Sequence, residues 1–155
     1  MDGSNFGGRA ILVDTREQLP LWNSKEPMVL RVKLDVGDYT TDDLLGKAHI
    51  ERKSPIDLYG SLVQGHERFR REILSAGEHG IKIAVFTECS LPVFINKKFH
   101  GGARLKVEPS VLSKIVDTME TKYKVDFFWC SGRHEMKDNM LMWFERQRQL
   151  VGTNG

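Results

Sequence analysis

The sequence predicts an α/β fold in which a mixed central sheet is flanked by helices, and three observations support this. Between residues 11 and 53, short strand-like segments follow one another without an amphipathic helix. From residue 55 onward, helical and strand-like patterns alternate, which is the order of helix-linked strands in one sheet. The segment 81–88, IKIAVFTE, is almost continuously apolar, as expected of a strand covered on both faces.

The first half of the chain supplies three predicted strands and a loop. ILVD at 11–14 is an apolar run that ends in an acid, which predicts a buried strand. Residues 15–27 contain two prolines and are expected to form a loop, in which Trp22 anchors on the core rather than stacking on a nucleobase. MVLRVKL at 28–34 alternates polar and apolar residues, and AHIERK at 48–53 ends at a Ser-Pro break, so both are predicted strands.

The second half supplies the helices and the remaining strands. In chain order these are helices at 55–63 and 66–76, a strand at 81–88, a helix from Pro109, a strand at 125–130 and a helix from Ser131. Apolar residues recur at helical spacing in the last two helices. We expect the first three strands to form an antiparallel meander and the later strands to add in parallel through right-handed crossovers.

Composition and charge fit one intracellular domain. The chain has 155 residues, of which 40% are hydrophobic and 28% charged, and its net charge is only +2, which excludes a strongly basic nucleic-acid wrapper. No apolar run approaches the ~20 residues of a membrane span. The start MDGSNFGG lacks a secretory signal, and two cysteines make no disulfide framework. We expect a domain at 9–151 between flexible tails at 1–8 and 152–155, in the cytoplasm of a prokaryotic or phage-infected host or in a eukaryotic nucleus.

Three charged residues predict a catalytic centre. Asp38 follows Gly37, where the backbone can turn sharply, while Glu51 and Lys53 lie two apart in a strand and therefore point to the same face. If the chain folds back between them, two carboxylates meet one ammonium. That set suits a divalent cation and a phosphodiester, which indicates a nuclease. Charged strand edges commonly show the same spacing, so the triplet alone is a weak signal.

A helix start follows this triplet directly. Ser54 can be its N-cap, Pro55 occupies the first helical position, and Asp57 stands at the third. Asp57 is therefore a helix cap, a residue near the metal, or both.

These residues together resemble a known family. The run GDY…IERKSPIDLYGSL is similar to the signature of the XPF-type structure-specific endonucleases, a branch of the restriction-endonuclease-like superfamily. Residues 13–17, VDTRE, resemble the family's hydrophobic-Asp-x-Arg-Glu element, and residues 65–72, GHERFRRE, resemble its Arg-Phe helix. The resemblance spans about residues 9 to 150. Many members also carry a tandem helix-hairpin-helix module or a helicase domain, and this chain has room for neither.

The resemblance implies a fold, an activity and a set of site residues. It implies a restriction-endonuclease-like core and a divalent-metal-dependent endodeoxyribonuclease that uses Mg²⁺, or Mn²⁺ as a substitute, on branched DNA or single-strand/double-strand junctions. The implied metal ligands are Asp38 and Glu51, with Asp14 and Glu17 as further ligands or close neighbours. The catalytic set is Asp14, Asp38, Glu51, Arg52, Lys53 and Asp57, in which Lys53 orients the attacking water or stabilises charge on the phosphate. Arg52 points away from its two neighbours, so a structural ion pair with Asp57 or Asp14 is the alternative for it.

Five basic residues are candidates for contacts with DNA. Arg16 is placed by its motif beside the acids, and Arg68 belongs to the Arg-Phe helix. Lys97, Lys98 and Arg104 lie in the basic, aperiodic stretch 90–108, which could follow a DNA backbone. The alternatives are a solvated helix face for Arg68 and a plain solvated connection for 90–108.

Two other functions stay open at this stage. One is a nuclease of the same superfamily with another task, such as resolving four-way junctions or processing phage DNA. The other is a catalytically silent DNA-binding or scaffold subunit, although every position of the acidic motif is filled here.

The final helix predicts a homodimer. Its apolar stripe consists of Met136, Met140, Trp143 and Phe144, and methionine with tryptophan is a common interface composition. We expect a two-fold interface that uses residues 136–144 and part of the helix at 110–119. The alternative is that the stripe packs on the sheet of its own chain.

Overall fold

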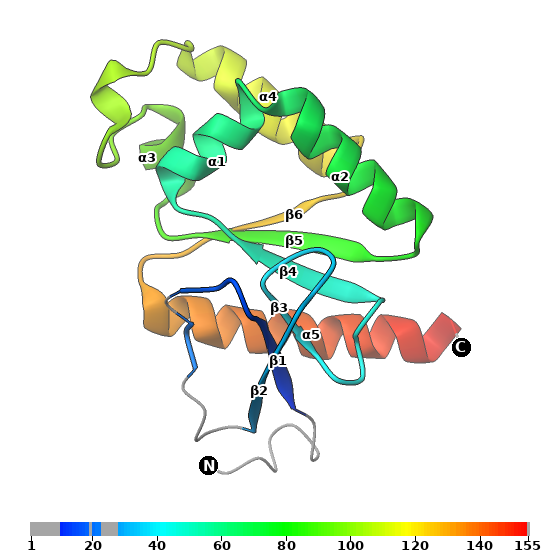
Figure 1. Cartoon of the computed structure of the whole chain (residues 1–155). Helices are drawn as coiled ribbons and strands as arrows, with labels where there is room; N and C mark the ends of the chain where they lie inside the picture. The colour runs from blue at the N-terminus through cyan, green and yellow to red at the C-terminus, as the bar shows by residue number, and fades with distance from the viewer. Residues whose placement is uncertain (1–9, 19, 23–27, 155) are drawn as a thin grey trace.

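The computed structural model describes residues 10–18, 20–22 and 28–154. Within these ranges one mixed six-stranded sheet carries helices on both faces (Figure 1), which confirms the predicted fold class. The strands are β1 (Ile11–Asp14), β2 (Val29–Val32), β3 (Tyr39–Thr41), β4 (Ala48–Arg52), β5 (Lys82–Thr87) and β6 (Asp126–Trp129). The helices are α1 (Pro55–Leu62), α2 (His66–Glu78), α3 (Leu91–Ile95), α4 (Pro109–Thr121) and α5 (Arg133–Asn154), with a short 3₁₀ helix at Gly102–Arg104.

The strand order corrects the expected meander. The sheet runs β2-β1-β3-β4-β5-β6, and β1 pairs with β2 in parallel rather than antiparallel. Residues 15–28 separate the two strands and are long enough for a crossover, which a parallel pair requires. The antiparallel neighbours are β1 with β3 and β3 with β4, while β4, β5 and β6 are parallel as predicted. The short strand β3 was not predicted.

The core has two layers, one on each face of the sheet. Side chains of β5 alternate between them: Ile83 and Val85 pack with α1, α2 and α4, whereas Ala84 and Phe86 pack with α5. Figure 1 shows the same division, with α5 alone on one face and the other helices on the opposite one. The near-continuous apolar sequence of this strand follows from burial on both faces.

The apolar stripe of α5 lies inside the fold. Met136, Met140, Trp143 and Phe144 are all buried against the sheet, and the Trp143 indole nitrogen donates a hydrogen bond to Asp126 Oδ2 at 2.8 Å. The apolar residues Leu112, Val116 and Met119 of α4 are buried as well. The location predicted for a homodimer interface is therefore wrong, because the sheet of the same chain already covers it.

Smaller expectations have mixed outcomes. Trp22 is buried and meets the Tyr39 ring edge-on at 5.6 Å, so it anchors on the core as predicted. Helix α5 continues to Asn154, so residues 152–154 of the expected C-terminal tail are helical, while the expected tail at 1–8 lies outside the described residues. In the described part of the chain, no helix combines the length and apolar character that a membrane crossing needs.

Candidate active site

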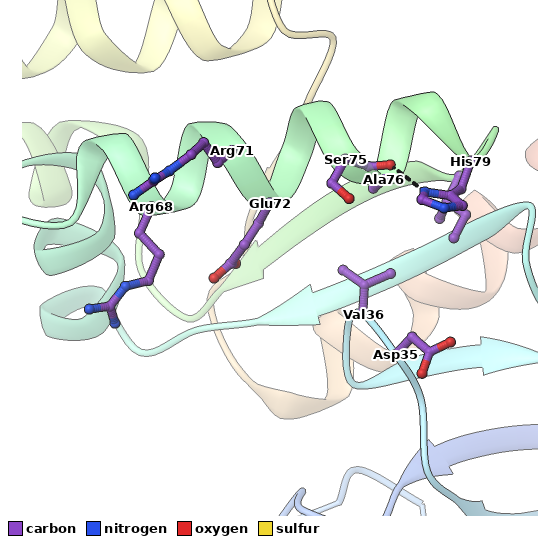
Figure 2. A pocket seen from close by; sticks show the side chains of 9 residues that line it. Asp35, Val36, Arg68, Arg71, Glu72, Ser75, Ala76 and His79 are labelled. Carbon is purple, nitrogen blue, oxygen red and sulfur yellow. Dashed lines mark hydrogen bonds between the residues drawn. The ribbon is translucent and has the colours of Figure 1, made fainter.

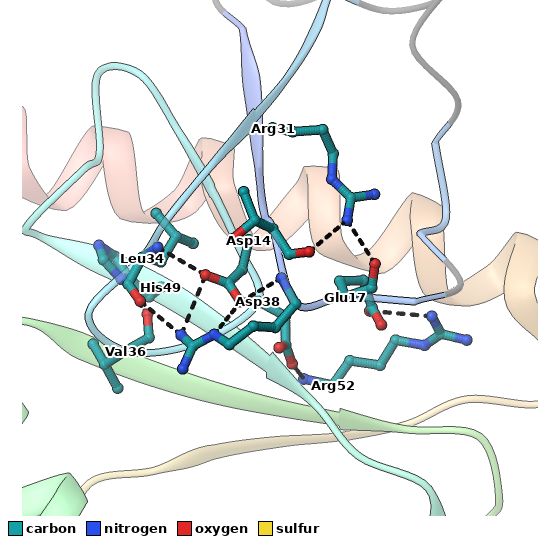
Figure 3. Close-up of polar contacts among 10 residues, drawn as sticks. Asp14, Glu17, Arg31, Leu34, Val36, Asp38, His49 and Arg52 are labelled. Carbon is teal, nitrogen blue, oxygen red and sulfur yellow. Dashed lines mark hydrogen bonds and ion pairs between the residues drawn. The ribbon is translucent and has the colours of Figure 1, made fainter.

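A glycine turn presses Asp38 against β4. Gly37 has a φ of +83°, and a Cβ atom there would lie 3.0 Å from the Ile50 carbonyl oxygen, so any other residue would be strained and would push against β4. The Asp38 backbone nitrogen donates to that same oxygen at 2.7 Å. The Asp38 carboxylate accepts a hydrogen bond from the Arg52 backbone nitrogen, also at 2.7 Å. The two halves of the motif are therefore joined through the main chain (Figure 3).

His49 holds the start of this turn. Its ring is buried, with Nδ1 2.7 Å from the Val36 carbonyl oxygen and Nε2 2.9 Å from the Gly46 backbone nitrogen. Because an amide N–H can only donate, Nε2 is the acceptor and the proton lies on Nδ1, which donates to Val36. Burial lowers the pKa of His49, which keeps this neutral form. Nothing in the sequence pattern distinguishes this histidine from any polar residue in a strand.

Asp38 and Glu51 share a hollow of about 420 Å³. Burial and the charge of Glu51 raise the pKa of Asp38 to about 7, against the lowering effect of its hydrogen bond from Arg52. Burial likewise raises the pKa of Glu51, while the positive charge of Lys53 opposes that shift. Two half-buried carboxylates therefore repel each other, and a cation between them would relieve the repulsion.

The positive charge of Lys53 lowers the pKa of both carboxylates, and Lys53 borders two hollows that share Arg16 or Glu72 with the Asp38–Glu51 hollow. Its backbone nitrogen donates to Phe86 at 3.0 Å, which fixes the chain where β4 ends. Its ammonium group lies 5.9 Å from the centre of the Phe69 ring, a cation–π distance. Phe69 belongs to α2, so the Arg-Phe helix packs directly beside the Glu-Arg-Lys strand. Asp38, Glu51 and Lys53 are thus brought together.

Asp14 anchors its neighbours. It is 1% exposed, and its two oxygens accept four hydrogen bonds: three from Arg16, at 2.7, 3.1 and 3.2 Å, and one from the Leu34 backbone nitrogen at 2.8 Å. These bonds hold its pKa at about 2. These hydrogen bonds occupy the acceptor sites of both oxygens, so of the two roles expected for Asp14 the close neighbour of the metal agrees better with this geometry than the ligand. Both Asp14 and Arg16 border the Asp38–Glu51 hollow, and the Arg16 side chain is exposed.

Glu17 pairs with Arg52 on the other side of Lys53. Its Oε2 accepts from the Tyr39 hydroxyl at 2.9 Å and from Arg52 Nη1 at 3.3 Å. Arg52 therefore forms a structural ion pair with Glu17; the expected alternative to a catalytic role for Arg52 was an ion pair with Asp57 or Asp14. Glu17 lines a second hollow of about 560 Å³ together with Lys53, and its charge still contributes to the raised pKa of Asp38.

Asp57 lies at the predicted helix start. Ser54 is the N-cap of α1, and its hydroxyl accepts the Asp57 backbone N–H at 3.2 Å. The Asp57 side chain is exposed and borders the second hollow beside Lys53. The capping acceptor is thus Ser54, which leaves the Asp57 carboxylate available for another role.

The predicted DNA contacts divide into two groups. Arg68 is exposed and borders a hollow of about 400 Å³ that also contains Lys53. Lys97 is half-buried and its ammonium donates to the Val107 carbonyl oxygen at 2.6 Å, so this side chain holds the loop. Lys98 and Arg104 are exposed, but Arg104 borders a hollow that contains none of the acids. The stretch 90–108 is also more regular than expected, since it includes α3 and the 3₁₀ helix.

Two further acids border the Asp38–Glu51 hollow. They are Glu72 of α2 and Asp35, which precedes the glycine turn. The negative charge of Glu72 contributes to the raised pKa of Glu51. The position of Glu72 four residues after Arg68, on the same helix face, is the signal that could have found it.

The donor set at this site fits a hard divalent cation. Among the described residues, no three His, Cys, Asp or Glu side chains are gathered in a way that would hold a metal ion by themselves. Mg²⁺ does not need such a cage, since it is commonly bound through one or two carboxylates and keeps several waters. Asp38 and Glu51 supply two carboxylates whose mutual repulsion a cation would offset, so the residues present fit this group.

The fold is similar to that of two solved structures, although no protein-family model and no curated protein sequence matches the chain. XPF from Aeropyrum pernix aligns with a TM-score of 0.64 and 18% identity over 92% of this chain and 65% of that one. XPF from Aeropyrum pernix in complex with DNA aligns with a TM-score of 0.60 and 18% identity over 94% and 66%. The chain thus spans just under two thirds of either structure. At this level of identity the likeness concerns the fold: the chain shares the α/β fold of these XPF structures, as the resemblance in its sequence implied.

Proposed function

We propose that this protein is a divalent-metal-dependent DNA endonuclease. The observation that carries the proposal is that Asp38 and Glu51 line the same hollow, while the positive charge of Lys53 acts on both carboxylates. The similarity in fold to an XPF structure solved with DNA supports the same proposal.

Asp38 and Glu51 would hold Mg²⁺, with Mn²⁺ as a substitute. A bound divalent cation supplies two things: it lowers the pKa of a coordinated water and it offsets charge on the phosphate. The main-chain contacts of Asp38 fix its carboxylate before a cation arrives, so little reorganisation is needed on binding.

The positively charged residues would act on the phosphodiester itself. Lys53, steadied by the Phe69 ring, offers an ammonium that can orient the attacking water or stabilise charge that develops on the phosphate oxygens. Arg16 is held in one orientation by Asp14, and its exposed guanidinium can contact a neighbouring phosphate. Asp14 and the Glu17–Arg52 pair are positioning groups in this mechanism.

We extend the proposal to branched DNA, such as flaps, forks and junctions, on the resemblance in sequence. A homodimer stays a prediction, and it would need a surface other than the buried stripe of α5. The two rival functions differ in their outcome with DNA: a junction-resolving or phage DNA-processing enzyme would prefer four-way junctions, whereas a silent scaffold subunit would bind without cutting.

A cleavage assay tests the proposal. Labelled flap, fork, four-way junction and duplex DNAs, with a closed circular single strand to establish endonuclease action, are incubated with Mg²⁺, Mn²⁺ or EDTA. We expect metal-dependent cleavage that Asp38→Asn abolishes without loss of fold or DNA binding. Asp42→Asn is the matched control, since it makes the same chemical change at an exposed position. Binding without cleavage of any substrate would favour the scaffold function instead.

A further inference from the structure

A hollow of about 470 Å³ lies beside the acids, and no role described above uses it. One wall is a single face of α2, which presents Arg68, Arg71, Ser75 and His79 at spacings of three and four residues. In Figure 2, Arg68 and Glu72 point from α2 toward the sheet, while Val36 points back toward the helix from the opposite wall. A volume of this size lies within the range of small-molecule sites.

This hollow, which we call the α2 hollow, continues into the Asp38–Glu51 hollow. Asp35, Val36 and Glu72 border both. A chain whose phosphate reached the carboxylate pair would therefore place its next unit in the α2 hollow. The site lies one unit away from the proposed chemistry rather than on a remote surface.

The lining combines an apolar floor with a charged rim. Val36, Ala76 and Ile81 provide apolar surface, and Ala76 is almost fully buried. Arg68 and Arg71 provide two exposed guanidinium groups on the helix wall. A flat aromatic base can lie on the apolar surface while a guanidinium contacts the phosphate attached to it.

The two carboxylates of the rim argue against a paired strand. Asp35 and Glu72 repel phosphates, so a duplex backbone laid along the hollow would meet like charge. An unpaired base meets no such obstacle, because it is uncharged and its exposed edge can donate to a carboxylate. A base held in a duplex would first have to leave its stack and its partner, which costs free energy.

The geometry points to the α2 hollow as the binding site of one unpaired nucleotide, next to the phosphate that is cut. The inference rests on the proposed nuclease function and assigns one unpaired nucleotide of its substrate to a defined place beside α2. Arg68 and Arg71 bind the phosphate of this nucleotide, and the apolar floor receives its base.

The test couples a change in the protein to a change in the DNA. Ser75→Trp fills the α2 hollow from an exposed helix position, and Leu74→Trp places the same side chain at an exposed position outside the hollow. Flap substrates carry one abasic site, moved one position at a time through the nucleotides on either side of the cut. We expect one abasic position to slow the wild-type protein by roughly tenfold. Ser75→Trp should cleave intact DNA as slowly as the wild type cleaves that abasic substrate. The abasic site should not slow Ser75→Trp further. Leu74→Trp should have wild-type rates on both substrates.

A second pair of variants isolates the phosphate contact. Arg71→Gln and Arg70→Gln remove the same charge from the same helix, but Arg71 borders the α2 hollow whereas Arg70 pairs with Glu67 outside it. Only Arg71→Gln should slow cleavage of the flap substrate. Unchanged melting temperatures establish that all four variants fold.

A binding measurement separates failure of this inference from failure of the proposed function. Fluorescence anisotropy of a labelled single-stranded pentanucleotide is measured with Asp38→Asn, alone and combined with Ser75→Trp or Leu74→Trp. If no substrate is cut, but Ser75→Trp weakens pentanucleotide binding and Leu74→Trp does not, the nucleotide site stands and the nuclease proposal falls. If cleavage occurs and neither the abasic scan nor Ser75→Trp affects it, the inference is overturned and the nuclease proposal stands. Pentanucleotide binding that is the same in all three proteins also overturns the inference.

Discussion

The Asp38 carboxylate accepts a hydrogen bond from the Arg52 backbone nitrogen at 2.7 Å, so the acid of one segment is tied to the strand that carries the other acid. A second main-chain bond, from Asp38 to Ile50, holds the same residue. Because main-chain atoms make both contacts, substitutions of nearby side chains should change the charge around Asp38 without displacing it.

Lys53→Ala should slow cleavage by about 100-fold at saturating Mg²⁺, as expected when one group that stabilises charge in the transition state is lost. Its backbone contact with Phe86 survives the substitution, so the fold should be kept. The measurement is the single-turnover rate, with the exposed Lys47→Ala as the control for loss of one positive charge. A wild-type rate at saturating Mg²⁺ would remove Lys53 from the chemistry.

Asp57→Asn should reduce cleavage while changing stability by only about 0.3–1 kcal/mol, the effect of one acid in the first turn of a helix. The reason is that Ser54 provides the capping oxygen. The companion variant Ser54→Ala should behave in the opposite way, with a loss of about 1 kcal/mol and retained activity. If Asp57→Asn kept full activity and lowered the melting temperature more than Ser54→Ala did, Asp57 would have a structural role alone.

The metal-free protein should lose stability as the pH rises from about 4 to about 7. Burial and Glu51 raise the pKa of Asp38 from 3.8 to about 7, so the folded protein holds a proton there that the unfolded chain has already released. Denaturant unfolding in EDTA should therefore show the wild type losing stability relative to Asp38→Asn over this window, and no further relative loss above it.

The comparison with Asp38→Asn is needed because other buried groups titrate nearby. The pKa of His49 is lowered by burial, so its contribution has the opposite sign and stability from it is lost as the pH falls. Glu51 has a raised pKa and the same sign as Asp38. A difference between the two proteins that does not vary with pH would contradict the raised pKa of Asp38.

His49→Ala should cost about 1–3 kcal/mol, because it leaves the Val36 carbonyl and the Gly46 amide without their partner. Cleavage should fall as well, since the turn that carries Asp38 begins at Val36. His49→Gln should recover part of both losses, because its amide can donate to one group and accept from the other. If His49→Ala has wild-type activity and stability, the ring does not hold this turn.

Trp143→Ala should destabilise the fold by about 3–5 kcal/mol, the usual cost of removing a buried tryptophan. The variant also loses the hydrogen bond to Asp126. Met142→Glu, at a neighbouring position that is 69% exposed, should leave the melting temperature nearly unchanged. If light scattering showed that the wild type is a dimer and that Trp143→Ala is a folded monomer, Trp143 would instead be an interface residue.

The fold could be predicted where local pattern and tertiary context agree. Burial on both faces follows from the sequence of β5, and the sharp turn before Asp38 follows from Gly37. Strand β3 has only three residues, and its two threonines run directly into the acidic turn that begins at Asp42, although both threonines are fully buried. Its strand geometry comes from pairing with β1 and β4, which a local pattern does not reveal. The direction of β2 is likewise set by its pairing with β1, which a local pattern does not reveal.

The site could be predicted as far as the motif reaches. Spacing brings Asp38, Glu51 and Lys53 together, but it does not say which charges neutralise one another. Arg52 pairs with Glu17 because β3 lies beside β4, where Tyr39 pairs with Ile50. The Tyr39 hydroxyl donates to Glu17, which brings the loop after β1 to the end of β4. The Asp14 carboxylate accepts hydrogen bonds from Arg16 and Leu34, and these partners become apparent only in the folded chain.

The position of α5 has a consequence for how the protein folds during translation. The side chains of Ile11, Val13 and Tyr39 share one apolar cluster with Met140 and Phe144, which are synthesised after them. During translation this face of the sheet therefore faces water until the final helix has left the ribosome. A premature stop codon before residue 140 would remove the cover from the first strands, so it would cost the chain its whole fold rather than its last helix.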